Sequence, residues 1–256
     1  MGKSNKGRIT RGRDLDKWRN NRAAAPEGCI RIIGGQYRGQ TLLYSGDRVT
    51  RPMKDNVREA LFNLVGGYLG GTIVFDLFAG TGAVGLEALS RQAAHAVLVE
   101  RHVPTSKIIR QNTESLAVTG QSTICCSDTF FWTRQFEKEM QQKKISCLPL
   151  EFDVLSQHPW SVFCCPPYDL FLDSEEKLTR LIATFAQLCP ANSLIVTEFD
   201  SRFDADKLPD SQLWKTREYS PAILSVRRIP ENQDLDDSAS EGNPVIESGQ
   251  VNPAHQ

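Results

Sequence analysis

The stretch from Thr72 to Glu87 constrains the fold of this chain more than any other part of the sequence. It opens with the apolar run Ile73-Val74-Phe75, which is typical of a strand buried on both faces of a parallel sheet. Asp76 ends that run. Three glycines follow with the G-x-G-x-x-G spacing of a tight turn that lets backbone approach a ligand: Gly80, Gly82 and Gly85. Helical periodicity begins at once, so a nucleotide-like ligand there would meet free N–H groups and the positive end of a helix dipole.

A second carboxylate lies where a nucleotide site needs one. The apolar run Ala96–Val99 predicts the next strand, which ends at Glu100, a suitable distance further on for hydrogen bonds to ribose hydroxyls. The segment Asp76–Gly82 resembles the first motif of class I S-adenosylmethionine-dependent methyltransferases. A dinucleotide cofactor also fits the glycine spacing, so both nucleotide interpretations stay open at this point.

Length and composition predict one sizeable α/β domain with appendages. The chain has 256 residues, of which 40% are hydrophobic and 24% charged, as in ordinary globular proteins. The net charge of −1 hides eight basic and two acidic residues in 1–25, and six acidic residues without Lys or Arg in 231–256. We therefore expect a basic flexible arm over 1–27, either a solvated tail or a phosphate contact, and an acidic disordered tail over 230–256.

The sequence argues against several classes of protein. No apolar run approaches the roughly 20 residues of a membrane span, and the basic N-terminus lacks the apolar core of a signal peptide, so we expect a cytoplasmic protein. The seven cysteines are an odd number without C-x-x-C spacing, which predicts reduced thiols and neither disulfides nor a zinc site. The four histidines form no metal-ligand pattern, and no metal is predicted.

Positive charge is concentrated in an N-terminal segment, 28–70. Within it, Cys29–Leu43 predicts a β-hairpin that turns at or near Gly34-Gly35, and the periodicity of 57–64 predicts a helix. Four arginines belong to this segment: Arg31, Arg38, Arg51 and Arg58. Each alone reads as an ordinary surface or salt-bridged residue, but together with the aromatic Tyr37 they predict contact with RNA.

Five segments together carry a more specific resemblance. They are Arg31–Gly39, Thr50–Pro52, Val57–Asn63, Asp76–Arg91 and Val99–Glu100. In these segments the chain resembles the bacterial 16S ribosomal RNA guanine-N2 methyltransferases of the RsmD type, closely from Ile30 to about Asn112 and more loosely to Arg228. The resemblance implies methyl transfer from S-adenosylmethionine to the exocyclic N2 amine of a guanine in 16S ribosomal RNA. The implied partner is 16S ribosomal RNA, either free or in the assembling small ribosomal subunit, and we expect the protein to be a monomer.

The resemblance further implies a fold and a cofactor site. The fold is the Rossmann-like class I methyltransferase domain over 71–229, whose seven-stranded, mostly parallel sheet has helices on both faces, with 28–70 as a hairpin and helix extension. Asp128 would accept from the adenine amino group, although it is equally well placed to cap the helix predicted from Thr129. The implied S-adenosylmethionine site consists of Asp76, Phe78, Ala79, Gly80, Thr81, Gly82, Gly85, Glu100 and Asp128.

A second motif follows another predicted buried strand, 160–164. It reads Cys165-Pro166-Pro167-Tyr168, where amino-methyltransferases of this class carry Asp/Asn-Pro-Pro-Tyr/Phe. The two prolines fix an extended backbone without N–H groups. By resemblance, the Pro166 carbonyl and the side chain at position 165 accept hydrogen bonds from the target amine, and Tyr168 stacks on the flipped base.

Cys165 departs from this pattern, because a thiol is a weaker acceptor than the oxygen of Asp or Asn. Two interpretations of the thiol stay open: a thiolate of lowered pKa beside a cationic cofactor, and a small apolar filler. The departure also motivates an alternative function, that of a relative that binds ribosomal RNA without methylating it.

The rest of the chain continues the α/β alternation. Apolar Phe130, Phe131 and Trp132 predict core positions, with one ring lining the adenine slot. Interleaved charges predict a solvated helix and loop over 135–151. Helical periodicity over 175–188, a strand over 193–199 and a closing hairpin over 214–229 then complete the expected sheet, whose last strand runs antiparallel.

Overall fold

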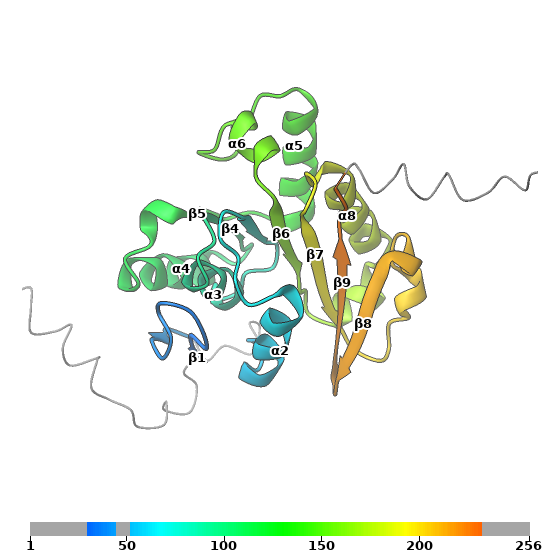
Figure 1. Ribbon diagram of the computed structural model, residues 1–256, viewed down its shortest axis with the longest axis horizontal. Helices are drawn as coiled ribbons and strands as arrows, with labels where there is room; N and C mark the ends of the chain where they lie inside the picture. The colour runs from blue at the N-terminus through cyan, green and yellow to red at the C-terminus, as the bar shows by residue number, and fades with distance from the viewer. Residues whose placement is uncertain (1–29, 45–51, 232–256) are drawn as a thin grey trace, which may run out of the picture.

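The computed structural model describes residues 30–44 and 52–231. The predicted basic arm over 1–27, Arg51, and all but the first two residues of the predicted acidic tail over 230–256 lie outside the described residues. The described part has the predicted α/β architecture, with a central sheet between two layers of helices (Figure 1). No helix in this part of the chain is long and apolar enough to cross a membrane.

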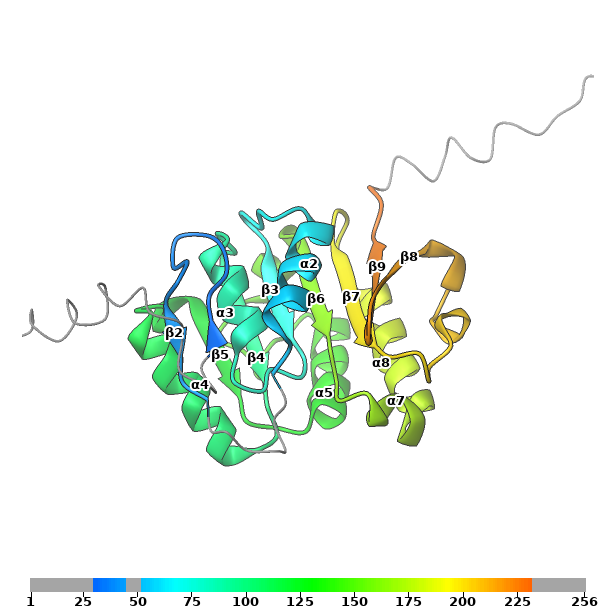
Figure 2. The ribbon, with the colours of Figure 1, turned by 90° about the horizontal axis from the view of Figure 1, so that it is seen from below.

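The sheet has seven strands in the order β5-β4-β3-β6-β7-β9-β8 (Figure 1, Figure 2). Parallel pairing joins the first five strands of that order, and β9 pairs antiparallel with both of its neighbours. The expected antiparallel last strand is thereby confirmed. The strands are β3 (Ile73–Asp76), β4 (His95–Val99), β5 (Ser122–Cys125), β6 (Trp160–Cys164), β7 (Leu194–Phe199), β8 (Trp214–Tyr219) and β9 (Ala222–Arg228).

Helices cover both faces of the sheet, as predicted. One face packs against α2 (Asp55–Val65), α3 (Ala83–Ser90) and α4 (Val103–Ser115). The other face packs against α5 (Thr129–Gln141), α6 (Phe152–Gln157), α7 (Asp169–Asp173) and α8 (Glu175–Leu188). The described part of the sheet domain also contains three short 3-10 turns: η1 (Thr119–Gln121), η2 (Ala205–Lys207) and η3 (Ser211–Leu213).

The alternation of side chains along β3 explains why its sequence is apolar throughout. Val74 belongs to the core on the α2 and α3 face, whereas Ile73 and Phe75 belong to the core on the α5 and α8 face. Because successive side chains of a strand point to opposite faces, a strand covered on both sides needs apolar residues at every position. Phe75 is the centre of an aromatic cluster, with its ring 4.8 Å from that of Trp160 and 5.5 Å from that of Phe136.

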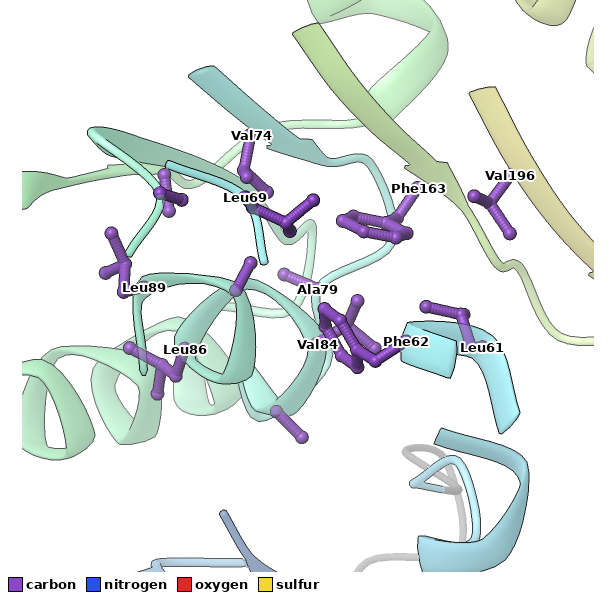
Figure 3. Packing of buried hydrophobic residues seen from close by; sticks show 14 of the residues in the cluster. Leu61, Phe62, Leu69, Val74, Ala79, Val84, Leu86, Leu89, Phe163 and Val196 are labelled. Carbon is purple, nitrogen blue, oxygen red and sulfur yellow. The ribbon is translucent and has the colours of Figure 1, made fainter. Parts of the chain in front are cut away.

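The N-terminal extension shares the core of the sheet domain. Figure 3 shows Phe62 of α2 beside Val84 of α3 and Ala79, and the Phe62 and Phe163 ring centroids are 5.7 Å apart. Gly66 ends α2 in the left-handed conformation at φ 112, which a residue without Cβ adopts readily. The helix therefore docks onto the face of the sheet that carries α3 and is part of the same core.

The predicted hairpin exists, but its strands are very short. β1 (Ile30–Arg31) pairs antiparallel with β2 (Thr41–Leu42), and the loop 32–40 connects them. Two further hydrogen bonds, Ile32 N to Gln40 O and Gly39 N to Ile32 O, both 2.8 Å, extend the pairing into the loop. The turn is therefore wider than one at Gly34-Gly35.

Two local expectations are wrong. Phe131, predicted in the core, is 57% exposed because it lies in the first turn of α5 on the solvent side, whereas Trp132 is buried. Within the predicted solvated segment 135–151, Glu139 is buried, because it accepts hydrogen bonds from the N–H groups of Ser146 and Cys147 that follow α5. Periodicity within one segment does not reveal such folding of a loop back onto its own helix.

Candidate active site

The direction in which successive strands are added to the sheet reverses at β3, and ligand sites in such sheets lie at this position. From β3 the chain crosses to β4 on one side, whereas β6 pairs with β3 on the other side. In open parallel sheets, ligands bind in the crevice outside the carboxyl ends of the strands at such a point. Four side chains with hydrogen-bonding or thiol groups lie at or directly after the carboxyl ends of β3, β4, β6 and β7: Asp76, Glu100, Cys165 and Glu198.

The glycine turn between β3 and α3 is fixed by the neighbouring strand. Ala79 N donates to Val99 O at 3.0 Å, which places the turn against the end of β4. Gly80 and Gly82 have φ values of 54 and 82, in the left-handed region that favours glycine. At Gly85 a Cβ would lie 2.5 Å from Leu98 Cδ2, so this glycine lets α3 pack closely against β4.

Asp76 is a buried carboxylate at the end of β3. Its Oδ2 accepts a hydrogen bond from Gly85 N at 3.0 Å, at the start of α3. Burial raises the pKa of Asp76 to about 7; the hydrogen bond from Gly85 opposes the rise, and the nearby Glu100 carboxylate adds to it. A cationic ligand in the crevice would favour the ionised form of this group.

Glu100 lies directly after β4 and faces the glycine turn. Its Oε2 accepts from Gly80 N at 2.9 Å, and its Oε1 accepts from His102 N at 2.7 Å. Both oxygens are thus held by backbone N–H groups while the side chain stays half-buried. The structure brings Glu100 and the glycine turn together, and its role toward ribose stays a prediction.

Asp128 caps the helix that follows β5. Its Oδ1 accepts from Phe131 N at 3.0 Å, and α5 begins at Thr129 as predicted. The capping interpretation of Asp128 is therefore confirmed, and contact with adenine stays a prediction for this exposed side chain. Phe78 and Phe130 meet near the same edge with an edge-to-face contact between their rings, 6.3 Å apart.

Two further predicted cofactor residues, Ala79 and Thr81, are buried in the glycine turn. The Thr81 carbonyl accepts from Asn112 Nδ2 of α4 at 3.1 Å. Asn112 also exchanges hydrogen bonds with the backbone of Leu43, at 2.7 Å and 3.2 Å. The turn is therefore tied to α4 and, through it, to the N-terminal extension.

The motif Cys165-Pro166-Pro167-Tyr168 leads from β6 into α7. Pro166 is buried, Pro167 is exposed, and the Pro167 carbonyl accepts from Leu170 N at 2.9 Å to start α7. The Pro166 carbonyl accepts no hydrogen bond from any residue within 30–44 and 52–231. It is therefore not engaged by the described chain, and its role toward a target amine stays a prediction.

The protein surroundings of Cys165 favour the neutral thiol. Burial, together with the nearby carboxylates of Glu198 and Asp76, raises the pKa of Cys165 well above its ordinary value. These surroundings disfavour a thiolate at Cys165, and a thiolate beside a cationic cofactor stays a prediction. A neutral, partly buried thiol agrees with the alternative, a small apolar filler that packs against the α2 and α3 core.

Glu198 in β7 is a site residue that sequence reasoning missed. Its Oε1 accepts from the Tyr168 hydroxyl at 2.6 Å, and its backbone N–H donates to the Cys165 sulfur. Burial raises the pKa of Glu198, although the bond from Tyr168 opposes the rise. The available signal was a single carboxylate inside the apolar run Leu194–Phe199, where a strand covered on both faces has no structural need for one.

Arg58, predicted to contact RNA, does not face solvent. Its side chain is fully buried, and its guanidinium donates to Arg31 O at 2.6 Å and to Asp55 Oδ1 at 3.0 Å. Its Nε lies 3.7 Å from Oε2 of the buried Glu87. The assignment of Arg58 to RNA is therefore wrong, since it has no exposed surface to offer a phosphate.

Glu87 is the second residue that sequence reasoning missed. Its two oxygens accept from Ile33 N and Gly34 N, each at 2.7 Å, and its Oε1 also accepts from Arg91. A charged residue in the otherwise apolar helix Ala83–Ser90 was the signal for it. Glu87 thus fastens the hairpin loop onto α3.

The remaining predicted RNA contacts have different surroundings. Arg31 is exposed and pairs with Asp55 at 3.1 Å, and Arg38 is exposed on the hairpin loop. Contact of both with RNA stays a prediction, as it does for Arg51 outside the described residues. Among the described side chains no three His, Cys, Asp or Glu residues are arranged to hold a metal ion.

Comparison with known proteins gives a consistent picture. The family model described as conserved hypothetical protein 95 matches residues 30–227. Ribosomal RNA small subunit methyltransferase D of Escherichia coli K12 is 46% identical over 89 residues, which cover 35% of this chain and 45% of that protein. The protein of the same name from Haemophilus influenzae is 30% identical over 201 residues, which cover 78% of this chain and 93% of that protein.

Comparison with solved structures also gives a methyltransferase. A solved structure described as putative methyltransferase yhhF from Escherichia coli is 28% identical with a TM-score of 0.59, and the match covers 80% of this chain and 100% of that one. The matches to the first curated relatives, from Bacillus subtilis and Escherichia coli, span about half of their lengths, 54% and 45%. Since the family model matches most of the chain, this protein belongs to the family of the ribosomal RNA small subunit methyltransferase D proteins.

Proposed function

We propose that this protein transfers a methyl group from S-adenosylmethionine to the exocyclic N2 amine of a guanine in 16S ribosomal RNA. The observation that carries the proposal is that the glycine turn, the Glu100 carboxylate and the Cys165–Tyr168 motif follow the carboxyl ends of three neighbouring parallel strands, β3, β4 and β6, at one edge of the sheet. The relatives named ribosomal RNA small subunit methyltransferase D support the substrate class.

The chemistry of the crevice fits this cofactor. S-adenosylmethionine supplies an electrophilic methyl group on a positively charged sulfonium. Glu100 after β4, and Asp76 at the end of β3 once a cation favours its ionised form, would supply negative charge that suits this ligand. Glu100 would accept from the ribose hydroxyls, and N–H groups after Gly80 and Gly82, at the start of α3, would donate to the ligand.

The target amine needs acceptors, because its lone pair is delocalised into the guanine ring. Held by two acceptors, the nitrogen can direct its lone pair at the methyl carbon; the C–S bonding pair stays on sulfur, and the amine releases one proton to solvent. The Pro166 carbonyl is available for the first hydrogen bond. Tyr168 follows in the same motif and would stack on the flipped base.

The RNA would approach across the N-terminal extension. Arg31 and Arg38 are exposed on β1 and the hairpin loop, and Arg51 precedes α2 in sequence. Cations of this kind contact phosphates and position a protein on RNA without reading its sequence. The hairpin loop is held on α3 by Glu87, which fixes Arg31 and Arg38 relative to the ends of the strands.

The decisive experiment measures methyl transfer. The protein is incubated with S-adenosylmethionine labelled in its methyl group and 16S ribosomal RNA transcribed in vitro, both free and reconstituted into small subunits. We expect label in the RNA, and digestion followed by mass spectrometry should identify N2-methylguanosine. Label at another position of guanine, or in another base, would contradict the N2 assignment.

A second outcome is built into the same experiment. Cys165 offers a neutral thiol where the family motif has an oxygen, so a relative that binds RNA without methylating it is the competing function. RNA binding and cofactor binding without any transfer of label would support it. Thermal stabilisation by NAD, with none by S-adenosylmethionine, would instead revive the dinucleotide interpretation.

A further inference from the structure

We propose that Glu198 accepts a hydrogen bond from the methyl-accepting amine and so replaces the oxygen acceptor that position 165 lacks. The inference rests on the proposed function and adds a residue outside the motif that carries it. It makes Glu198 a catalytic residue in contact with the substrate, while Cys165 only fills space beside it.

Glu198 lies next to position 165 on the neighbouring strand. β6 and β7 run parallel with Cys164 paired to Thr197, so the next residues along, Cys165 and Glu198, are neighbours with side chains on the same face. The Glu198 N–H donates to the Cys165 sulfur, which confirms the contact. A carboxylate on Glu198 therefore lies beside the position from which the family motif projects its oxygen.

The Glu198 carboxylate is buried without a cation. Its residue is only 7% exposed, and among the described residues no Lys, Arg or His pairs with it. The Tyr168 hydroxyl donates to Oε1, which leaves Oε2 without a hydrogen-bond donor from the described chain. Burial of a carboxylate without a cation is costly for a fold, and such groups are typical of functional sites.

The hydrogen bond from Tyr168 orients this carboxylate. By donating to Oε1 at 2.6 Å, the Tyr168 hydroxyl fixes the side chain and directs the free oxygen away from itself. Tyr168 is also the residue that stacks on the base in the proposed function. The same hydrogen bond thus links the stacking residue to the acceptor, and the base and its amine would be held by one rigid unit with the Pro166 carbonyl.

The test compares variants of similar side-chain size in single-turnover methylation of 16S RNA, free or reconstituted into small subunits, whichever accepts label, with RNA and S-adenosylmethionine saturating. We expect Glu198→Met, which removes both oxygen acceptors, to slow the reaction about 10- to 100-fold, the effect of losing a hydrogen bond to a charged group. Cys165→Asp in the Glu198→Met background moves the carboxylate to the neighbouring strand end and should restore most of the rate. Glu218→Met is the matched control, because Glu218 is an exposed glutamate on β8.

Tyr168→Phe separates direct contact from support. If Glu198 served only to hold Tyr168, then Tyr168→Phe and Glu198→Met would lose the same rate and Cys165→Asp would rescue neither; that result overturns the proposal. A Glu198→Met variant as fast as the natural protein overturns it as well. Calorimetric binding of S-adenosylmethionine should be unchanged in all folded variants, since the amine acceptor acts on the RNA.

Two safeguards keep the outcomes distinct. If Glu198→Met fails to fold, Glu198→Asp retracts the carboxylate by one methylene, and its rate should fall and recover on adding Cys165→Asp. If the natural protein binds both ligands but transfers no methyl group to free RNA or to reconstituted subunits, the proposed function itself fails and this inference falls with it. An active natural protein with an equally active Glu198→Met variant rejects the inference alone.

Discussion

Glu87 and Arg58 lie together in the protein interior without exposed side-chain surface, with 3.7 Å between Glu87 Oε2 and Arg58 Nε. The pair joins α2 to α3, and both partners also hold the hairpin, since Arg58 donates to Arg31 O and Glu87 accepts from Ile33 N. The N-terminal extension is thus fixed to the sheet domain by a buried charge network. An arginine that the sequence suggests for RNA contact instead stabilises the fold.

Replacement of Arg58 should therefore destabilise the protein. Arg58→Met leaves Glu87 without one buried partner, and we expect a loss of about 3 kcal/mol in the free energy of unfolding, the lower end for a broken buried pair. We expect a loss at the lower end of the range for broken buried ion pairs because Arg91 still pairs with Glu87, at 2.9 Å. Urea denaturation measures the loss, and Arg38→Met, at an exposed position, is the control expected to stay near the natural protein. Equal stability of the two variants would contradict the structural role.

The exposed arginines should control the salt dependence of RNA binding. Changing Arg31, Arg38 and Arg51 to Ala should flatten the slope of log affinity against log salt by roughly 0.7–0.9 for each phosphate that the variant no longer neutralises. Because Arg31 pairs with Asp55, its share should be the smaller one. The control removes three exposed cations from the other side of the sheet: Lys144, Lys177 and Arg180. If both triple variants change the salt slope equally, the three arginines act as ordinary surface charge and do not contact the RNA specifically.

Glu100 should contribute to cofactor affinity. Glu100→Ala removes an acceptor from the proposed ribose contact, and the loss of a hydrogen bond to a charged group, about 1.5–3 kcal/mol, corresponds to roughly 10- to 150-fold weaker binding of S-adenosylmethionine. Calorimetry measures it, with Glu114→Ala on the exposed side of α4 as control. Because Glu100 also accepts from Gly80 N and His102 N, the unfolding temperature without cofactor must be measured in parallel. Unchanged affinity in a folded variant would reject the ribose contact.

Asp76 should make stability depend on pH. Its pKa in the folded protein is about 7, above the ordinary value of 3.8, so the folded state holds a proton that the unfolded state has released. Between these two pH values the folded protein should lose stability as the pH rises, relative to Asp76→Asn, which has no carboxyl group to ionise. Above a pH of about 7 the difference in unfolding temperature between the two proteins should become constant. A difference that does not change with pH would contradict the raised pKa.

Cys165 should behave as an unreactive thiol. Since burial raises its pKa, iodoacetamide at neutral pH should modify the exposed Cys126 well before Cys165, which peptide mass spectrometry resolves. Cys165→Ala should cost less activity than Glu198→Met, because the thiol supplies little as an acceptor. Preferential alkylation of Cys165, together with a large loss of activity in the Ala variant, would restore the thiolate interpretation.

Local patterns in the sequence predicted much of the site. The strand at 73–76 with its glycine turn, the carboxylate Glu100 after the next strand, and the rigid Pro166-Pro167 pair after β6 all occur at strand ends as expected. Each of these signals lies within a few residues, because strand, turn and helix formation depend on short-range geometry. Parallel strands then bring their carboxyl ends to one edge of the sheet, so separate motifs meet there.

What the sequence alone determined is therefore the order of the elements and which strand ends carry polar groups. Only the tertiary structure decided which charges are inside. Ile33 and Glu87 are 54 positions apart, and Tyr168 and Glu198 are 30 apart, yet hydrogen bonds join each pair. Whether an arginine meets solvent or a buried glutamate, and whether a strand glutamate gains a tyrosine as partner, depends on packing between distant segments. The polarity of one residue and its neighbours in sequence does not contain that information, because burial and pairing are properties of the assembled core.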